Sequence, residues 1–274
     1  MSLPAIALLV LALPAAPLSP GPTVAVEDTL RTELPEILVR APRVTLAEIL
    51  ARVARGEARR DSAMIDQTYL VTMRLVRDTA GRAAPTLLHE RVTRIYKKKP
   101  NFVRAQLLRN FDFRPKKRTQ MKVEMDFDPG MDEEVVNFAF RPEARRDFRY
   151  RIVGRDLAGR HLIYRIAFEP RSRLDPTQPH GTVWVDTNDF VIVRQEVGFD
   201  RAPAPPLLKG VDRMVIERQN VDGHWVLKRV LVRLEAGLPL PQVGRSFDLG
   251  LQFGSYAINT GLPDSLFATA RDRR

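Results

Sequence analysis

The chain of 274 residues contains no cysteine. This excludes disulfide bonds, thiol nucleophiles, cysteine-ligated metals and the lipidated cysteine that follows a bacterial lipoprotein signal. There are only four histidines, and none stands in the HxH or HExxH spacing of a zinc site. Neither a GxSxG elbow nor a P-loop occurs. We therefore expect no catalytic residue, metal or cofactor, and we expect that the protein is not an enzyme.

Acidic residues are in the minority, since 33 Asp and Glu stand against 44 Lys and Arg, a net charge of +11. A basic balance suits nucleic acid or an anionic membrane surface. However, the arginines are scattered, and the clusters at Lys97–Lys99 and Pro115–Arg118 have no aromatic-spaced nucleic-acid motif beside them. We interpret the basic residues as side chains spread over solvent-facing strand positions, and we expect no nucleic-acid partner.

Long apolar runs are absent apart from Leu3–Ala16. That run is too short for a membrane span, which takes about 20 residues. Small residues at positions 15, 16 and 19 offer cleavage sites. We interpret residues 1–19 as a signal peptide. This predicts a periplasmic protein with no transmembrane helix in the mature chain.

Residues 20–43 are rich in proline and have no clear period, so we expect a flexible arm. Within the arm, Glu33–Arg43 has a short apolar run between prolines. The segment is either a linker or added edge strand, or a peptide that docks on an outer-membrane or envelope protein.

A helix is predicted directly after the arm. Thr45 and Glu48 form a capping box, and Val44 and Ile49 form a hydrophobic staple. Apolar residues then follow at helical spacing, namely Leu46, Ile49, Leu50, Val53 and Ala54. The charged residues at the end are expected on the solvent face: Glu57, Arg59, Arg60 and Asp61. We predict one amphipathic helix of about four turns.

Everything after this helix has the alternating pattern of strands. A hairpin is predicted from strands Thr182–Val185 and Phe190–Val197, joined by an Asp-Thr-Asn-Asp turn, and a second at Asp222-Gly223. We expect a mainly β, α+β fold: an unclosed antiparallel β-barrel of about ten or eleven strands. Residues 44–260 would form this domain with the helix as its lid, and residues 261–274 a C-terminal tail.

The apolar face of such a sheet is a candidate ligand cavity, because each buried methylene of an acyl chain contributes about 0.8 kcal/mol. The candidate cavity residues are Tyr69, Val71, Met73, Leu162, Tyr164, Ile166, Phe168, Phe247, Leu249, Leu251 and Phe253. The candidate lid residues are Leu46, Ile49, Leu50 and Val53. Each of them is alternatively an ordinary core residue.

Three segments resemble a known family: VTLAEILARVARGEA from Val44, DQTYLVTMRLV from Asp66 and GTVWVDTNDFVIVRQEV from Gly181. Behind a signal peptide, they resemble the outer-membrane lipoprotein-sorting proteins, the LolA/LolB-like carriers. The resemblance implies an unclosed barrel with a helical lid over a hydrophobic cavity that carries lipoprotein acyl chains or other lipids. This chain differs in its arm and in an acidic insertion, Asp126–Glu134.

The acidic insertion matches a calcium loop only in part, because Asn137 stands where the bidentate Glu would fall. We interpret it as a solvated loop or a flap at the cavity mouth. The function that follows is a non-catalytic, monomeric periplasmic carrier that binds a lipid or acylated lipoprotein. The alternative is a cell-envelope scaffold whose arm docks on an outer-membrane partner.

Overall fold

The computed structural model describes residues 44–77, 86–112, 138–158, 161–172, 174–201, 208–240 and 244–271. The chain divides into residues 1–43 and residues 44–274, and only the second unit contains described residues. The predicted signal peptide, the predicted arm and the acidic segment 126–134 lie outside the described residues.

Helix α1, Leu46–Ala63, begins where the sequence predicts it. The Thr45 hydroxyl accepts a hydrogen bond from the backbone N–H of Glu48 at 3.2 Å, as a helix N-cap does. The helix has 18 residues, about five turns rather than four. Its buried residues include Glu57 and Arg60 near the C-terminal end.

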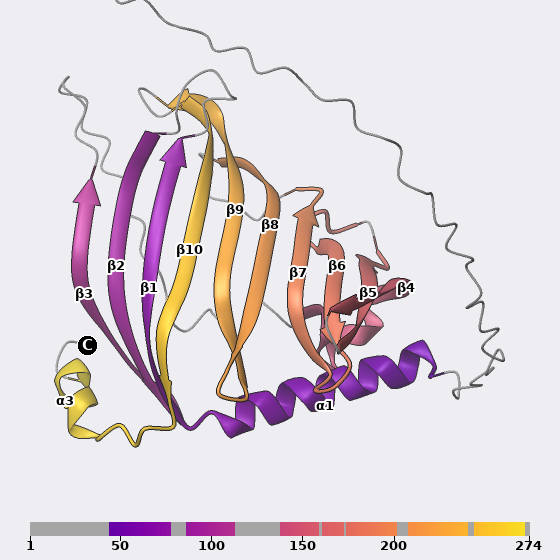
Figure 1. The fold of residues 1–274 in the computed structure, drawn as a ribbon. Helices are drawn as coiled ribbons and strands as arrows, with labels where there is room; N and C mark the ends of the chain where they lie inside the picture. Colours follow the sequence, from indigo (N-terminus) through magenta and orange to yellow (C-terminus); the bar gives the residue numbers. More distant parts are fainter. Residues whose placement is uncertain are drawn as a thin grey trace, which may run out of the picture. The chain divides into compact units, whose positions relative to one another are not determined.

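Among the described residues, ten strands form a single antiparallel sheet, and the prediction of an unclosed, mainly β fold with an N-terminal helix is confirmed. Their order across the sheet is β3-β2-β1-β10-β9-β8-β7-β6-β5-β4, so β3 and β4 are the two edges (Figure 1). The strands are β1 Asp66–Arg77, β2 Thr86–Lys98, β3 Phe102–Asp112, β4 Phe148–Ala158, β5 His161–Pro170, β6 Pro179–Asp186, β7 Val191–Phe199, β8 Leu208–Val221, β9 His224–Leu240 and β10 Gly244–Ile258.

Three short helices complete the described part: η1 Phe138–Phe140, η2 Ala144–Arg146 and α3 Ser265–Arg271. Helix α3 lies in the stretch that the sequence suggests as a tail, and it packs on edge strand β3. The rings of Phe102 and Phe267 are 5.6 Å apart, and Arg104 donates to the Leu266 carbonyl at 2.7 Å. Part of the β3 edge is thereby covered.

Both predicted hairpin turns form. Asp222 and Gly223 have φ of 49° and 82°, the left-handed conformation that a tight two-residue turn requires. At the other hairpin, the Asp186 carboxylate accepts from the backbone N–H of Asn188 at 2.8 Å. The predicted start of the next strand at Phe190 is wrong, because Phe190 closes the turn with φ of 55° and β7 begins at Val191.

Helix α1 lies at one end of the strands, beside the turn between β6 and β7 (Figure 1). Arg59 donates to the Asp189 carbonyl in this turn at 3.0 Å. Gly56 faces the same turn, so the backbone of the helix approaches the backbone of the loop directly. The missing side chain at position 56 therefore sets how closely the helix can sit on the sheet.

We expect Gly56→Ala to destabilise the protein by about 1–3 kcal/mol. The added Cβ would press into the carbonyl oxygens of Asp189 and Phe190. On an unopposed helix the same change would stabilise by about 0.5–1 kcal/mol, so the sign of the effect is diagnostic. Urea unfolding measures it, with Gly254→Ala as control because a Cβ there meets nothing within 4 Å. Stabilisation by Gly56→Ala would contradict the close approach.

Candidate ligand-binding interior beneath helix α1

The predicted cavity and lid residues lie together in the interior, where most of them join one apolar cluster between the sheet and α1. The buried members are Tyr69, Val71, Met73, Tyr164, Ile166, Phe168, Leu251, Phe253, Ile49, Leu50 and Val53, and the partly buried members packed on them are Leu46, Leu162 and Leu249. Phe247 belongs instead to a smaller cluster with Leu75 and Leu234. The apolar face is thus packed on itself and on the helix in this structure.

One end of the interior is aromatic. The Phe168 ring on β5 lies 6.0 Å from Phe138, 5.7 Å from Phe140 and 5.9 Å from Phe148, all in edge-to-face geometry. Two of these rings come from η1, which the strand pattern did not predict. Arg145 on η2 donates to the Leu50 carbonyl of α1 at 2.5 Å. The 3-10 segment therefore joins the helix to this end of the sheet.

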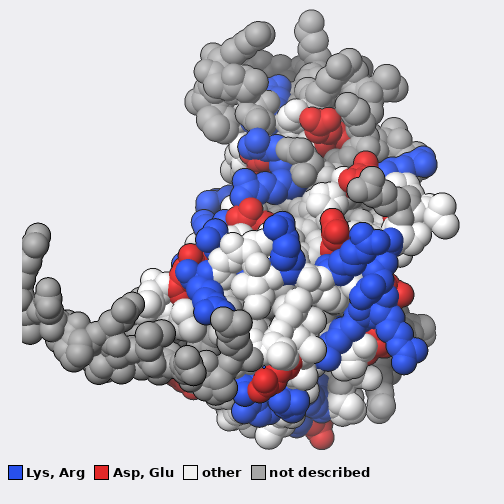
Figure 2. Space-filling model, turned by 90° about the vertical axis from the view of Figure 1, so that its right-hand side faces the viewer, with Lys and Arg blue, Asp and Glu red and all other residues white. Residues whose placement is uncertain are grey.

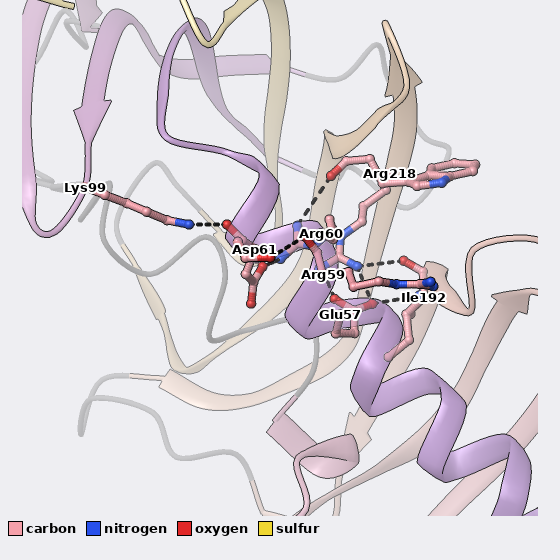
Figure 3. Close-up of polar contacts among 9 residues, drawn as sticks. Glu57, Arg59, Arg60, Asp61, Lys99, Ile192 and Arg218 are labelled. Atoms are coloured by element: carbon pink, nitrogen blue, oxygen red, sulfur yellow. Dashed lines mark hydrogen bonds and ion pairs between the residues drawn. The ribbon is translucent and has the colours of Figure 1, made fainter. Parts of the chain in front are cut away.

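A buried ionic cluster lies under the C-terminal half of α1 (Figure 3). The Glu57 carboxylate accepts from Arg218 of β8 at 2.7 Å and from the backbone N–H of Ile192 at 2.8 Å. Arg218 also donates to the Ile192 carbonyl at 3.0 Å. Arg60 approaches the second Glu57 oxygen at 3.3 Å. Glu57 is 3% and Arg218 5% exposed, so this ion pair is inside the protein.

The prediction that Glu57 and Arg60 face solvent is wrong. Both continue the buried stripe of Ile49 and Val53 at spacings of three and four residues, so the helix periodicity itself places them inward. Their charges indicated the solvent-exposed face of the helix, but Arg218 of the sheet pairs with the Glu57 carboxylate and compensates its buried charge. The sequence of β8 also indicates that Arg218 points inward, because it stands two residues after the buried Ile216 and therefore on the same face of the strand.

Burial by itself would raise the pKa of Glu57. The cations of Arg218 and Arg60 and the hydrogen bonds from Arg218 and Ile192 outweigh burial, so the pKa of Glu57 lies below its ordinary value. Desolvation also lowers the pKa of the Arg218 guanidinium, against the attraction of Glu57. Glu57 is therefore ionised at neutral pH, and its partner is a guanidinium, which stays protonated in proteins.

We expect the contribution of Glu57 to stability to be lost in acid. Its folded pKa is lowered from 4.5, so the contribution is complete above that value and disappears as pH falls through the lower folded value. The difference in free energy of unfolding between the wild type and Glu57→Gln should therefore shrink between pH 6 and pH 3. Urea unfolding at several pH values measures it. A difference that is constant with pH would contradict the assignment.

Several buried polar atoms here have no hydrogen-bond partner among the described residues. Gln195 of β7 is 0% exposed, and neither its amide nitrogen nor its amide oxygen is paired within that part of the chain. The Nε and Nη2 atoms of Arg218 also have no hydrogen-bond partner among the described residues. Buried polar groups of folded proteins are nearly always paired, so this concentration within an apolar interior is unusual. Sequence analysis did not single out either residue.

A groove of about 880 Å³ is lined mainly by residues of β4, β5 and β6. Most of its lining residues are polar, and they include Arg149, Arg151, Glu169 and His180. Seen from the side of β4, Lys, Arg, Asp and Glu surround a central area of other residues on this side of the molecule (Figure 2). Of the predicted cavity residues, Phe168 lines the groove. Tyr150 and Phe168 belong both to the groove lining and to the apolar cluster, so the groove adjoins the predicted interior.

Two of the histidines pair with aspartates in the described part of the chain. His161 contacts Asp186 at 2.5 Å, and His89 contacts Asp112 at 2.6 Å. His89 lies within β2 and is 7% exposed. No group of three or more His, Asp or Glu among the described residues could hold a metal ion.

Within the residues described, no helix combines the length and apolarity that a membrane crossing needs. No family model and no curated protein matches the chain. Solved structures similar to it include three bacterial proteins. A DUF1329 family protein from Desulfovibrio piger has 13% identity and a TM-score of 0.41, with 81% of this chain and 98% of that chain covered.

The second is a LolA superfamily protein from Nitrosomonas europaea, with 15% identity, a TM-score of 0.33 and coverage of 83% and 99%. The third is a putative outer membrane lipoprotein-sorting protein domain from Vibrio parahaemolyticus, with 13% identity, a TM-score of 0.35 and coverage of 82% and 98%. These neighbours include proteins of the group that the sequence resembles. The fold itself rests on the strand order and register of this chain.

Proposed function

We propose that the protein is a non-catalytic periplasmic carrier that binds a lipid or the acyl chains of a lipoprotein. The observation that supports this most directly is the continuous apolar face of an open ten-stranded sheet, against which a single long amphipathic helix packs. Apolar surface of this extent suits an acyl chain, because every methylene removed from water contributes about 0.8 kcal/mol. In this proposal the apolar cluster is the ligand-free, collapsed state of the cavity.

Helix α1 is the element that would move. Its polar attachments to the sheet lie at one end of the strands, through Glu57 to β7 and β8 and through Arg59 to the β6–β7 turn. Its apolar side chains Ile49, Leu50 and Val53 cover the interior. Displacing α1 would expose the predicted cavity residues without breaking a strand pair. This supports the role of α1 as a lid.

The location and the ends of the chain are part of the same proposal. Residues 1–19 would direct export and be removed, residues 20–43 would form the arm, and residues 44–260 would be the carrier domain. A monomer suffices, because lid and cavity come from one chain. Its partners would be the membrane lipid or lipoprotein that it loads and an envelope protein that receives it.

Native mass spectrometry of the protein purified from a bacterial envelope, followed by lipid extraction, tests the proposal. We expect a stoichiometric lipid or acylated peptide, and uptake of lipid from added vesicles by the delipidated protein. Deletion of residues 19–42 should leave this binding intact. A clean ligand-free mass with no uptake would overturn the carrier proposal. If deletion of residues 19–42 also abolished association with envelope proteins, the scaffold alternative would be supported.

A further inference from the structure

We propose that Arg218 and Gln195 anchor the anionic head group of the ligand, and that the Glu57 carboxylate occupies this anchor while α1 is closed. The inference rests on the proposed carrier function and specifies its ligand class. The ligand would be an amphiphile whose acyl chain fills the apolar interior and whose head group bears a carboxylate or a phosphate. Neutral amphiphiles of the same chain length would bind more weakly.

Gln195 points into the interior. In the sheet it stands opposite Val183 of β6 and Ile216 of β8, and both belong to the buried apolar cluster. Residues directly opposite in antiparallel strands share a face. Its amide therefore ends among apolar side chains, where neither amide atom finds a partner within the described residues. A buried amide without hydrogen-bond partners costs free energy of folding, unless the polar group of a bound ligand forms hydrogen bonds with it.

Arg218 enters the same region from the adjacent strand. It lies two residues beyond Ile216, so it is the diagonal neighbour of Gln195, a relation that places residues about 7–8 Å apart. Its Nη1 is engaged by Glu57 and by the Ile192 carbonyl. Its Nε and Nη2 have no partner among the described residues. These two N–H groups form one edge of the guanidinium, the edge that binds a carboxylate or phosphate in bidentate fashion.

Glu57 links this anchor to the lid. Because the carboxylate is on α1 and the guanidinium is on β8, opening the helix would leave Arg218 charged and unpaired in an apolar interior. An uncompensated buried charge is strongly unfavourable. An anionic head group removes that penalty, whereas an ester or alcohol does not. The ligand charge would therefore favour the open state over the closed one.

The experiment compares hexadecanoate with its methyl ester, and lysophosphatidate with the monoacylglycerol of equal chain, in competition binding to the delipidated protein. The wild type should bind the anionic member of at least one pair about tenfold or more tightly, as expected for hydrogen bonds to a charged group. Gln195→Met should lower that ratio, and Glu57→Gln, which removes the competing charge, should raise it. Gln252→Met, an exposed glutamine on β10, is the control and should leave the ratio unchanged.

Equal affinity for charged and neutral amphiphiles would overturn the anchor while leaving the carrier function in place. A charge preference that neither variant changes would also overturn it. Failure of every amphiphile to bind would overturn the carrier function as well. The pair that shows the larger preference identifies a carboxylate or a phosphate as the head group. If Glu57→Gln does not fold, Gln195→Met decides, because it removes an unpaired buried amide and should fold normally.

Discussion

Arg218→Met should lower the free energy of unfolding by about 3–5 kcal/mol, since it leaves the Glu57 carboxylate buried beside a neutral side chain. The Arg218 and Glu57 side chains are 1% and 4% exposed, so water cannot replace the lost partner. Because the cost comes from a buried carboxylate left with only the more distant Arg60, the double variant Glu57→Met with Arg218→Met should recover much of the loss. Urea denaturation of the single and double variants completes a double-mutant cycle.

Arg213→Met is the matched control for Arg218. Arg213 pairs with Glu196 at 2.6 Å on the opposite face of the same strand, but its side chain is 58% exposed. Exposed ion pairs contribute about 0–1 kcal/mol, so this variant should be nearly as stable as the wild type. If Arg218→Met cost no more than Arg213→Met, the buried cluster would not have the energetic role assigned to it.

Phe168→Ala should lower the free energy of unfolding by about 3–5 kcal/mol, the usual range for a buried phenylalanine. The Phe168 side chain is 2% exposed and is surrounded by the rings of Phe138, Phe140 and Phe148. Its removal would leave a cavity where β5 meets η1, and rings that interlock at right angles cannot collapse into it without losing contacts. Guanidinium or urea unfolding measures the loss.

The control for Phe168 is Leu157→Ala at the end of β4, where the side chain is 77% exposed. A surface change of this kind should stay within about 0.5 kcal/mol of the wild type. A loss of under about 1 kcal/mol for Phe168→Ala would mean that η1 does not pack on β5 as described. If both variants lost a similar free energy of unfolding, the loss for Phe168→Ala would not come from its packing in the core.

Strand periodicity was the most reliable guide to this fold. In β1, the apolar residues recur at every second position, and all four are buried in the structure, namely Tyr69, Val71, Met73 and Leu75. The alternation is informative because successive side chains of a strand point to opposite faces. Local chemistry was equally informative at Thr45 and at Asp222-Gly223, since a cap and a two-residue turn depend only on neighbouring residues.

The pairing of the polar groups in the candidate site could not be predicted in this way. Glu57 and Arg218 are 161 residues apart in the chain, and the sequence around either residue does not identify the other as its partner. A charged residue near a helix end normally faces water, and only the docking of α1 on β7 and β8 makes burial of Glu57 tolerable. Gln195 is similar, because its burial follows from its pairing with Val183 and Ile216.

By itself, the sequence determined the mainly β class, the start of the helix and which face of the strands is apolar. Each of these depends on residue type and on spacing along a few neighbouring positions. The tertiary structure alone decided that the apolar side chains pack closed beneath α1, that Phe138–Phe140 caps the aromatic end, and that a charged cluster sits inside. Those outcomes depend on contacts between segments that are distant in the sequence. The free energy of burying a charged side chain, in particular, depends on the partner that it meets and not only on its own residue type.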